Sequence, residues 1–283
     1  MRMKNKIKKA FGWSLYQIAN IFCREENFLS IYFHAPSPEL FEQIVLWLKK
    51  KKYRIIDINE CYDILSNKMK LEEKVAYLSF DDGWQSNMEL IPIIEKHNVP
   101  ITIFVATEPI VSGNYWWEYA GKAGGANKIS YMKKLEQREF LKELSLIKSD
   151  IELRRSSITE EDLDILVKHP LVSIQSHTVT HPILINCSQE TLDKELIESK
   201  KYLEEKTGEE IYAFSYPNGG FGLREVKAVK NAGYKIAFTT KPDILDTTTV
   251  DDILLVPRRS INSLDSLYVN LARIKGIWQK IKR

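Results

Sequence analysis

Short runs of β-forming residues alternate with amphipathic helical patterns along most of the chain, and this alternation limits the fold more than any other feature. Strands that are separated by helices run parallel, because a parallel connection needs about a dozen residues or more. The expected strands lie at residues 31–33, 54–58, 75–80, 101–106, 172–175, 211–215, 235–239 and 253–256. No glycine-rich phosphate-binding turn follows any of these runs, which disfavours an open dinucleotide-binding sheet. We therefore predict an α/β fold, a distorted or incomplete (β/α) barrel with parallel strands.

The 283 residues are enough for one large domain with two end segments. We predict that residues 28–262 form the barrel as a single domain, and that basic amphipathic helices form residues 1–27 and 263–283. The alternation breaks at about 112–158, which predicts an insertion after the fourth strand. The pair Trp116-Trp117 in this insertion could plug the core or form a wall against which a sugar ring stacks.

The basic amino-terminal segment differs from a cleaved secretory leader, which has an unbroken apolar core before a small-residue cleavage site. Here Ser14, Gln17 and Asn20 interrupt the apolar stretch, and charged residues follow it. We expect a retained helix that either packs on the domain or rests on an anionic membrane surface, and the same alternatives hold for the other end. This predicts a cytoplasmic protein, or one that is peripheral at the inner face of the membrane.

The composition excludes several classes of protein. The chain has 41 Lys and Arg residues against 38 Asp and Glu residues, and a net charge of +3 does not indicate a nucleic-acid partner. No apolar run approaches the roughly 18 residues of a membrane-spanning helix. Three scattered cysteines, Cys23, Cys61 and Cys187, give no disulfide framework and favour a reducing compartment. These features indicate a soluble globular enzyme or binding domain.

Two adjacent carboxylates, Asp81 and Asp82, end the third expected strand and are followed by Gly83. Consecutive side chains of a strand point to opposite faces, so the strand must bend here if both carboxylates are to face one site. Such a pair repels itself unless a cation or a proton lies between the two groups. Taken alone, the same three residues are also typical of a polar turn.

Two histidines, His177 and His181, follow the strand at 172–175. Imidazoles four residues apart can converge on one metal if they lie on one helical turn, and a structural pair is the alternative. With Asp82 they make a set of two imidazoles and one carboxylate, which leaves a position open for water. This set predicts a divalent ion, Zn²⁺ first, with Co²⁺, Ni²⁺ or Mn²⁺ as alternatives.

A third polar motif, the turn Pro217-Asn218-Gly219, follows the strand at 211–215. A turn of this kind holds its backbone amides in a fixed direction, and such amides can stabilise a developing oxyanion. It could equally be an ordinary turn.

Together, the three motifs resemble those of the polysaccharide deacetylase (NodB-homology, carbohydrate esterase) family, over about residues 30–261. The resemblance implies that Asp81 is the catalytic base and that Asp82, His177 and His181 bind the metal. It also implies that the backbone amide of Asn218 stabilises the oxyanion.

Two positions depart from the pattern of this family. Ser215 stands where the family often has an arginine that orients the base, and Arg258 could reach in from the last expected strand instead. The late histidine that supplies the general acid is also missing. His34, at the end of the first strand, resembles the acid of a permuted branch of the family, although it could be structural. His97 and His169 lie near helix ends and are expected to be structural.

The resemblance implies a hydrolase that removes N-acetyl groups from an amino sugar in a glycan or glycan precursor. Water would be activated by the metal and Asp81, and the leaving amine would be protonated by His34. The expected partner is an N-acetylated saccharide, with peripheral contact to a membrane or to a lipid-linked glycan as a further expectation. Two alternatives stay open: a deformylase or other hydrolase of non-peptide C–N bonds, and a catalytically inactive glycan-binding module.

Overall fold

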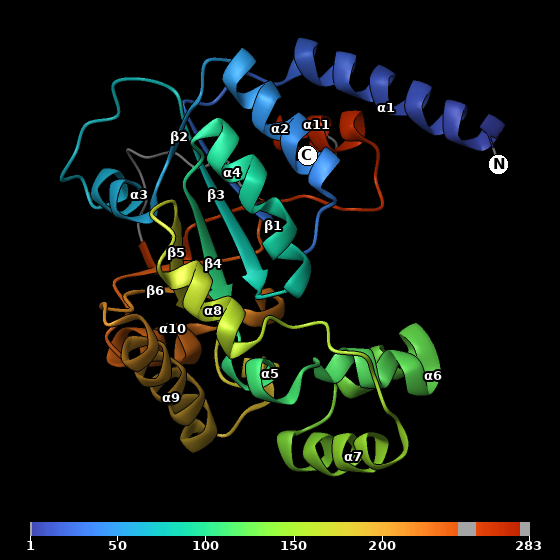
Figure 1. The fold of residues 1–283 in the computed structure, drawn as a ribbon, viewed down its shortest axis with the longest axis vertical. Helices are drawn as coiled ribbons and strands as arrows, with labels where there is room; N and C mark the ends of the chain where they lie inside the picture. Colours follow the sequence, from blue (N-terminus) through green and yellow to red (C-terminus); the bar gives the residue numbers. More distant parts are fainter. Residues whose placement is uncertain (1, 243–252, 278–283) are drawn as a thin grey trace.

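The sheet at the centre of the computed structural model is parallel at every strand pair among residues 2–242 and 253–277, the residues that the structure describes. Its strands follow one another across the sheet in the order β7 (Ile236–Phe238), β6 (Ala213–Ser215), β5 (Val172–Ser176), β4 (Ile101–Val105), β3 (Val75–Asp82), β1 (Phe28–Phe33) and β8 (Arg259–Ser260). A short strand, β2 (Arg54–Ile56), pairs with β3 beside this row. The sheet curls into an incomplete barrel with helices outside it, which confirms the predicted α/β fold (Figure 1).

Helices connect the strands and cover the outside of the sheet (Figure 1). They are α1 (Arg2–Phe22), α2 (Pro38–Lys50), α3 (Ile58–Leu65), α4 (Ile91–His97), α5 (Thr107–Ser112), α6 (Trp116–Met132), α7 (Gln137–Asp150), α8 (Glu160–Val167), α9 (Gln189–Thr207), α10 (Leu223–Asn231) and α11 (Leu267–Ile274). Local sequence fixes several of their starts. The Ser37 hydroxyl accepts a hydrogen bond from the Leu40 amide at the start of α2, and Thr159 and Asp162 form a reciprocal capping box at the start of α8.

Strand β3 is buried on both faces, and its alternation divides the core into two layers. Leu78 and Phe80 belong to the large apolar cluster between the sheet and the helices. Tyr77 belongs to a second cluster inside the barrel, where its ring stacks on that of Phe238 at 5.0 Å. Because Ser79 is two residues after Tyr77, its side chain lies on the same inner face of the sheet. The inward-facing side chains of β3 therefore continue toward the carboxyl end of the strand.

The prediction of a last strand at 253–256 is wrong. Ile253–Leu255 forms a 3-10 turn, and within this segment only Val256 forms a bridge, with Phe238 of β7. A short apolar run does not by itself distinguish a strand from a turn that packs into the core, and the following Pro257 lacks the amide that a ladder needs. The last strand is instead β8, which pairs with β1. Residues 256–260 therefore lie between the two edges of the curled sheet.

The two ends of the described chain pack together, since α1 and α11 share a small apolar cluster of Leu15, Ala19, Cys23, Ala272 and Ile277. Within the segment 263–283, predicted to be helical, α11 covers Leu267–Ile274, and residues 278–283 lie outside the description. Within the described ranges, no helix is both long enough and apolar enough to span a bilayer. The segment predicted as an insertion contains α6 and α7, which pack on each other near the carboxyl ends of the strands (Figure 1).

Candidate active site and metal centre

The residues singled out in the sequence gather around one cavity of about 480 Å³ at the carboxyl ends of the strands. Asp81 and Asp82 come from the end of β3, the two histidines from the segment after β5, and Asn218 from the turn after β6. The cavity is lined by His34, Asp81, Asp82, His177, His181 and Asn218, together with Trp84, Trp116, Trp117 and Lys133. Arg258 is fully buried and is not among the residues that line the cavity.

Strand β3 bends at its last residue. Asp82 has a φ of 79° and Gly83 has a φ of 90°, both in the left-handed region that a strand residue does not normally adopt. This bend turns the Asp82 side chain to the same side as that of Asp81, as both carboxylates line the cavity. A Cβ atom at Gly83 would lie 3.2 Å from Val105, so the bend also needs the small residue.

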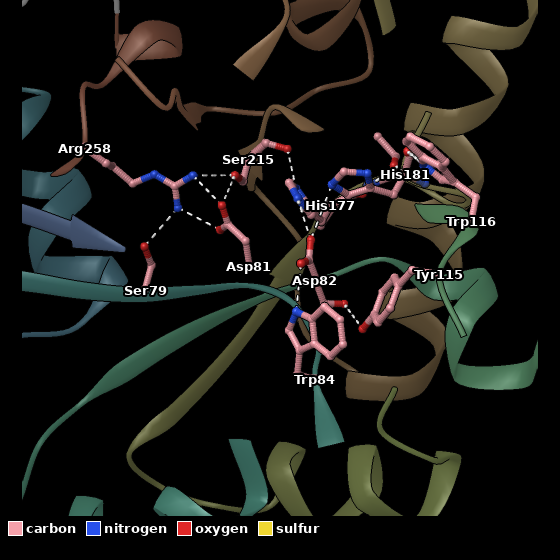
Figure 2. A network of polar contacts seen from close by, with 12 residues as sticks. Ser79, Asp81, Asp82, Trp84, Tyr115, Trp116, His177, His181, Ser215 and Arg258 are labelled. Carbon is pink, nitrogen blue, oxygen red and sulfur yellow. Dashed lines mark hydrogen bonds and ion pairs between the residues drawn. The ribbon is translucent and has the colours of Figure 1, made fainter. Parts of the chain in front are cut away.

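Three buried side chains converge in the way that a metal centre requires (Figure 2). One carboxylate oxygen of Asp82, Oδ1, lies 3.4 Å from Nε2 of His177 and 3.3 Å from Nε2 of His181. This oxygen is buried and has no hydrogen-bond partner among the described residues. An orphaned anionic oxygen between two imidazoles fits a divalent cation, which would satisfy all three groups. No other such group occurs in the described part of the chain.

The protonation states of these groups suit a cation. Burial alone would raise the pKa of Asp82, but the adjacent imidazole of His177 and the electrostatic influence of His34 and His181 outweigh it and hold that pKa below its usual range. Burial also lowers the pKa of His181 to about 3, because the apolar surroundings disfavour the charged ring. Asp82 is therefore ionised and His181 neutral at pH 7, which are the forms that bind a metal.

The two histidines do not lie on a helical turn, which corrects the geometry expected from their spacing. The segment 177–181 is an irregular loop with left-handed residues at Thr178 (φ 71°) and His181 (φ 54°). Glu195 of α9 holds this loop. Its carboxylate accepts hydrogen bonds from the backbone amides of Val179 and Thr180 at 2.8 and 2.9 Å, and from the Thr180 hydroxyl at 2.6 Å. The convergence of the imidazoles thus depends on a buried acid from another element.

Both histidines are also fixed by contacts of their own. The Nδ1 atom of His177 lies 2.7 Å from the carbonyl oxygen of Ser215, which leaves Nε2 to face Asp82. The indole N–H of Trp116 donates to the carbonyl oxygen of His181 at 3.0 Å. The first contact orients the His177 ring, as the outer contacts of metal-binding histidines do. The second fixes the backbone of His181, whose Nδ1 has no hydrogen-bond partner among the described residues.

Asp82 is held by two aromatic residues (Figure 2). The indole N–H of Trp84 donates to its second carboxylate oxygen, Oδ2, at 2.8 Å, and the Tyr115 hydroxyl donates to its backbone carbonyl at 3.1 Å. The rings of Trp84 and Tyr115 also pack on each other, with centroids 4.7 Å apart. With one oxygen held by Trp84, the free oxygen Oδ1 is directed at the two imidazoles.

Arg258 forms an ion pair with Asp81 (Figure 2). Its guanidinium donates to Oδ1 and Oδ2 of Asp81, both at 2.8 Å, and also to the hydroxyls of Ser79 at 3.0 Å and Ser215 at 2.7 Å. Burial would raise the pKa of Asp81, but the charge of Arg258 outweighs it, and the pKa of that carboxyl lies below its ordinary value. Asp81 is therefore ionised, and Ser215 accepts a hydrogen bond from Arg258.

His34 and Asn218 lie on the wall of the same cavity. His34 follows β1, its ring is exposed, and its backbone carbonyl accepts a hydrogen bond from Asn87 at 2.9 Å. Asn218 has a φ of 55°, and its side-chain oxygen accepts a hydrogen bond from Lys133 at 2.6 Å. Lys133 follows α6, so this bond joins the predicted insertion to the turn after β6.

The remaining histidines lie elsewhere. His97 and His169 line a different cavity of about 750 Å³ at the amino-terminal ends of the strands. Nε2 of His97 lies 2.8 Å from Glu42, and Nε2 of His169 lies 3.3 Å from Glu95. Neither ring contributes to the metal group, so this larger cavity lacks the chemistry of the smaller one.

Three residues that shape the site were not predicted from the sequence: Trp84, Tyr115 and Glu195. Trp84 follows the Asp-Asp-Gly turn directly, which was the available signal, whereas nothing local marks Glu195. Both residues of the tryptophan pair line the cavity. Trp116 is buried, whereas Trp117 is half-buried and meets the ring of His181 at a centroid distance of 4.5 Å.

Comparison with known proteins shows which family this sequence resembles. A family model described as polysaccharide deacetylase matches residues 68–237. YxkH of Bacillus subtilis (strain 168), whose name assigns it to the polysaccharide deacetylases, is 24% identical over 203 residues. That match takes 71% of this chain, which spans 57% of the relative's length. The poly-beta-1,6-N-acetyl-D-glucosamine N-deacetylase of Staphylococcus aureus (strain MSSA476) is 22% identical over 291 residues, which cover 99% of this chain and 87% of the relative.

Solved structures show the same fold. The Streptococcus pyogenes deacetylase PplD aligns with a TM-score of 0.63 at 22% identity, covering 87% of this chain and 96% of its own. IcaB from Ammonifex degensii aligns with a TM-score of 0.65 at 17% identity, covering 89% of this chain and 99% of its own. The family model matches more than half of the sequence, and the chain therefore belongs to the polysaccharide deacetylase family.

Proposed function

We propose that this protein is a metal-dependent hydrolase that removes N-acetyl groups from an amino sugar in a glycan or glycan precursor. One observation carries the proposal: the buried group of Asp82, His177 and His181 opens into the same cavity as the ion-paired carboxylate of Asp81. Hydrolysis of an amide can use a metal ion that activates water and a carboxylate that accepts the proton of that water, and this site has residues for both.

Asp82, His177 and His181 would hold the metal. Zn²⁺ suits two imidazoles and one carboxylate, and Co²⁺, Ni²⁺ and Mn²⁺ are the alternatives. When bound, a divalent ion polarises the acetyl carbonyl and lowers the pKa of a water molecule. The hydrogen bonds of Asp82 with Trp84, and of His177 with Ser215, would keep the metal-binding atoms directed at one point.

Groups of the protein itself would transfer the protons and stabilise the oxyanion. Asp81, which Arg258 keeps ionised, accepts the proton of the attacking water. The backbone amide of Asn218 donates to the oxyanion that forms on the acetyl carbon. His34 protonates the leaving amine, which is a poor leaving group without that proton. In this proposal the acid follows the strand β1, as would be expected for the permuted branch that His34 resembles.

The walls of the cavity support a saccharide as substrate. Trp117 is half-buried beside the metal group, where one face of a sugar ring could pack on it. The relative from Staphylococcus aureus is a deacetylase of poly-β-1,6-N-acetyl-D-glucosamine, and we assign this chain a substrate of the same chemical class, an N-acetylated amino sugar.

Release of acetate from a panel of N-acetylated oligosaccharides, with metal content measured on the same sample, tests the proposal. The expected result is acetate release that stops when a chelator removes the metal. Release of formate from N-formylated sugars, with no acetate from the acetylated ones, would support the deformylase alternative. A protein that holds metal and saccharide but releases neither acid would be a binding module.

A further inference from the structure

Helix α1 packs against the body of the domain with one face only. Leu15, Ala19 and Cys23 are buried there against α11. A Cβ atom at Gly12 would lie 2.7 Å from Oγ of Ser266, so the two segments are as close as a glycine allows. The Tyr16 hydroxyl accepts a hydrogen bond from the Trp47 indole at 2.8 Å. These contacts fix which side of α1 faces away from the domain.

The side of α1 that faces away carries large apolar side chains. Phe11, Ile18, Ile21 and Phe22 are between 45% and 74% exposed. At about 100° per residue, the four positions fall within an arc of about 100° of the helix surface. Four large apolar groups on one arc differ from the scattered exposed residues of an ordinary surface, and such a patch marks an interaction site.

The charge of α1 selects the partner. Its sequence contains five cationic residues, Arg2, Lys4, Lys6, Lys8 and Lys9, and neither Asp nor Glu. An amphipathic helix with an apolar face and an excess of cations suits the surface of an anionic bilayer, where the apolar groups enter the interface and the cations meet lipid headgroups. A second copy of the chain would offer these cations no carboxylate on its own α1.

We propose that α1 lies in the interface of an anionic lipid bilayer and holds the protein at the membrane surface. The exposed face, defined by Phe11, Ile18, Ile21 and Phe22, is the part that enters the interface. Figure 1 shows α1 at the end of the molecule away from the carboxyl ends of β3 and β4, where the cavity lies. A bilayer against α1 therefore leaves the cavity open to a saccharide. The proposal does not depend on the hydrolase activity.

Flotation of the whole protein with lipid vesicles tests this. We expect binding to vesicles of equal parts phosphatidylglycerol and phosphatidylcholine, and at least about tenfold less binding to phosphatidylcholine alone. The triple variant Phe11→Ser, Ile21→Ser, Phe22→Ser should lose about tenfold or more of the bound fraction. The matched control is Leu46→Ser, Ile165→Ser, Ile197→Ser, which changes residues of similar exposure on α2, α8 and α9 and should bind like wild type.

A second variant keeps the test independent of folding. Lys4→Gln, Lys6→Gln, Lys8→Gln and Lys9→Gln together leave the apolar face intact and should remove the preference for phosphatidylglycerol. The proposal is wrong if wild type does not float with the anionic vesicles, or if either the apolar or the lysine variant binds them as well as wild type does. It is also wrong if wild type is a dimer that the apolar triple variant converts to monomers, because a second copy would then cover this face.

Discussion

The guanidinium of Arg258 forms two parallel hydrogen bonds with the carboxylate of Asp81, each 2.8 Å long, although the two residues are 177 positions apart in the chain. Both side chains are almost completely buried, so each charge depends mainly on the other for compensation. Ser79 and Ser215 occupy further donor positions of the guanidinium. Burying such a pair costs a large desolvation energy. The attraction between the two charges offsets this cost only while both partners are present.

Replacement of Arg258 by Met should therefore destabilise the fold strongly. The variant leaves Asp81 as a buried charge without a partner, which costs about 3–5 kcal/mol of the free energy of unfolding. The double variant Arg258→Met, Asp81→Asn should recover part of this loss, because no unpaired charge remains. Urea denaturation in the presence of a chelator measures both without a contribution from metal. If the double variant loses as much free energy of unfolding as the two single variants lose in sum, the two groups do not act as a pair.

The two neighbouring carboxylates should fail in different ways. Asp81→Asn should retain about one divalent ion per chain and abolish acetate release, because an amide cannot take the proton of water. Asp82→Asn and His177→Ala should lose the metal first, since each removes one of three ligands. Elemental analysis together with acetate release distinguishes the variants. Equal metal loss in Asp81→Asn and Asp82→Asn would reverse the assignment of base and ligand.

The indole of Trp84 should matter for metal affinity rather than for packing. Trp84→Phe keeps an aromatic ring against Tyr115 but removes the hydrogen bond to Asp82, and we expect metal affinity to fall by about 10–100-fold. Trp47→Phe is the matched control, because it removes an indole hydrogen bond of the same length to Tyr16, outside the site. Titration with Zn²⁺ against a competing chelator measures both. Wild-type affinity in Trp84→Phe would show that Asp82 needs no such support.

Glu195 should support the histidine loop through its oxygen atoms. Glu195→Ala leaves the buried amides of Val179 and Thr180 without their acceptor, at a cost of about 1–3 kcal/mol for each buried group left unsatisfied, and it should weaken metal binding. Glu195→Gln retains an oxygen for the two amides and an N–H₂ group for the Thr180 hydroxyl, so it should lose much less. Thermal unfolding and metal titration test this order. Equal losses in both variants would mean that the negative charge, not the acceptor, holds the loop.

His34 should act on turnover without acting on the metal. His34→Ala should bind the metal as wild type does and lose about 10²–10⁴-fold in acetate release, the range for a positioned general acid. A general acid works only while protonated, so the variant should lack the basic limb of the wild-type pH–rate profile. The pH–rate profile of acetate release measures it. A variant with wild-type turnover and an unchanged profile would leave the acid to another group.

Much of the fold could be predicted because its signals are local. The capping residues at Ser37 and Thr159, and the runs that became β3, β4 and β5, need no information from elsewhere in the chain. The bend at Asp82 could be predicted as well, since two adjacent carboxylates can face one site only if the strand turns.

The parts that could not be predicted depend on contacts between distant segments. Residues 253–256 are apolar enough for a strand, but the fold uses Leu254 as a core residue in a turn, and the strand falls on the polar pair of β8. The histidine loop takes its shape from Glu195 on α9, and no spacing rule connects that acid to His177. Residues such as Glu195 are recognised only in the structure, from their contacts with the segments that carry the metal-binding side chains.

The position of Arg258 after all the other site residues also has a consequence for the order in which the site is made. A ribosome completes both aspartates, both histidines and the turn that contains Asn218 well before it adds residue 258. Until β8 pairs with β1, the carboxylate of Asp81 lacks its cationic partner, and β1 is synthesised long before β8. The site is therefore assembled only after residue 258 has been added, and a polypeptide released before Arg258 would contain every metal ligand but not the residue that pairs with the base.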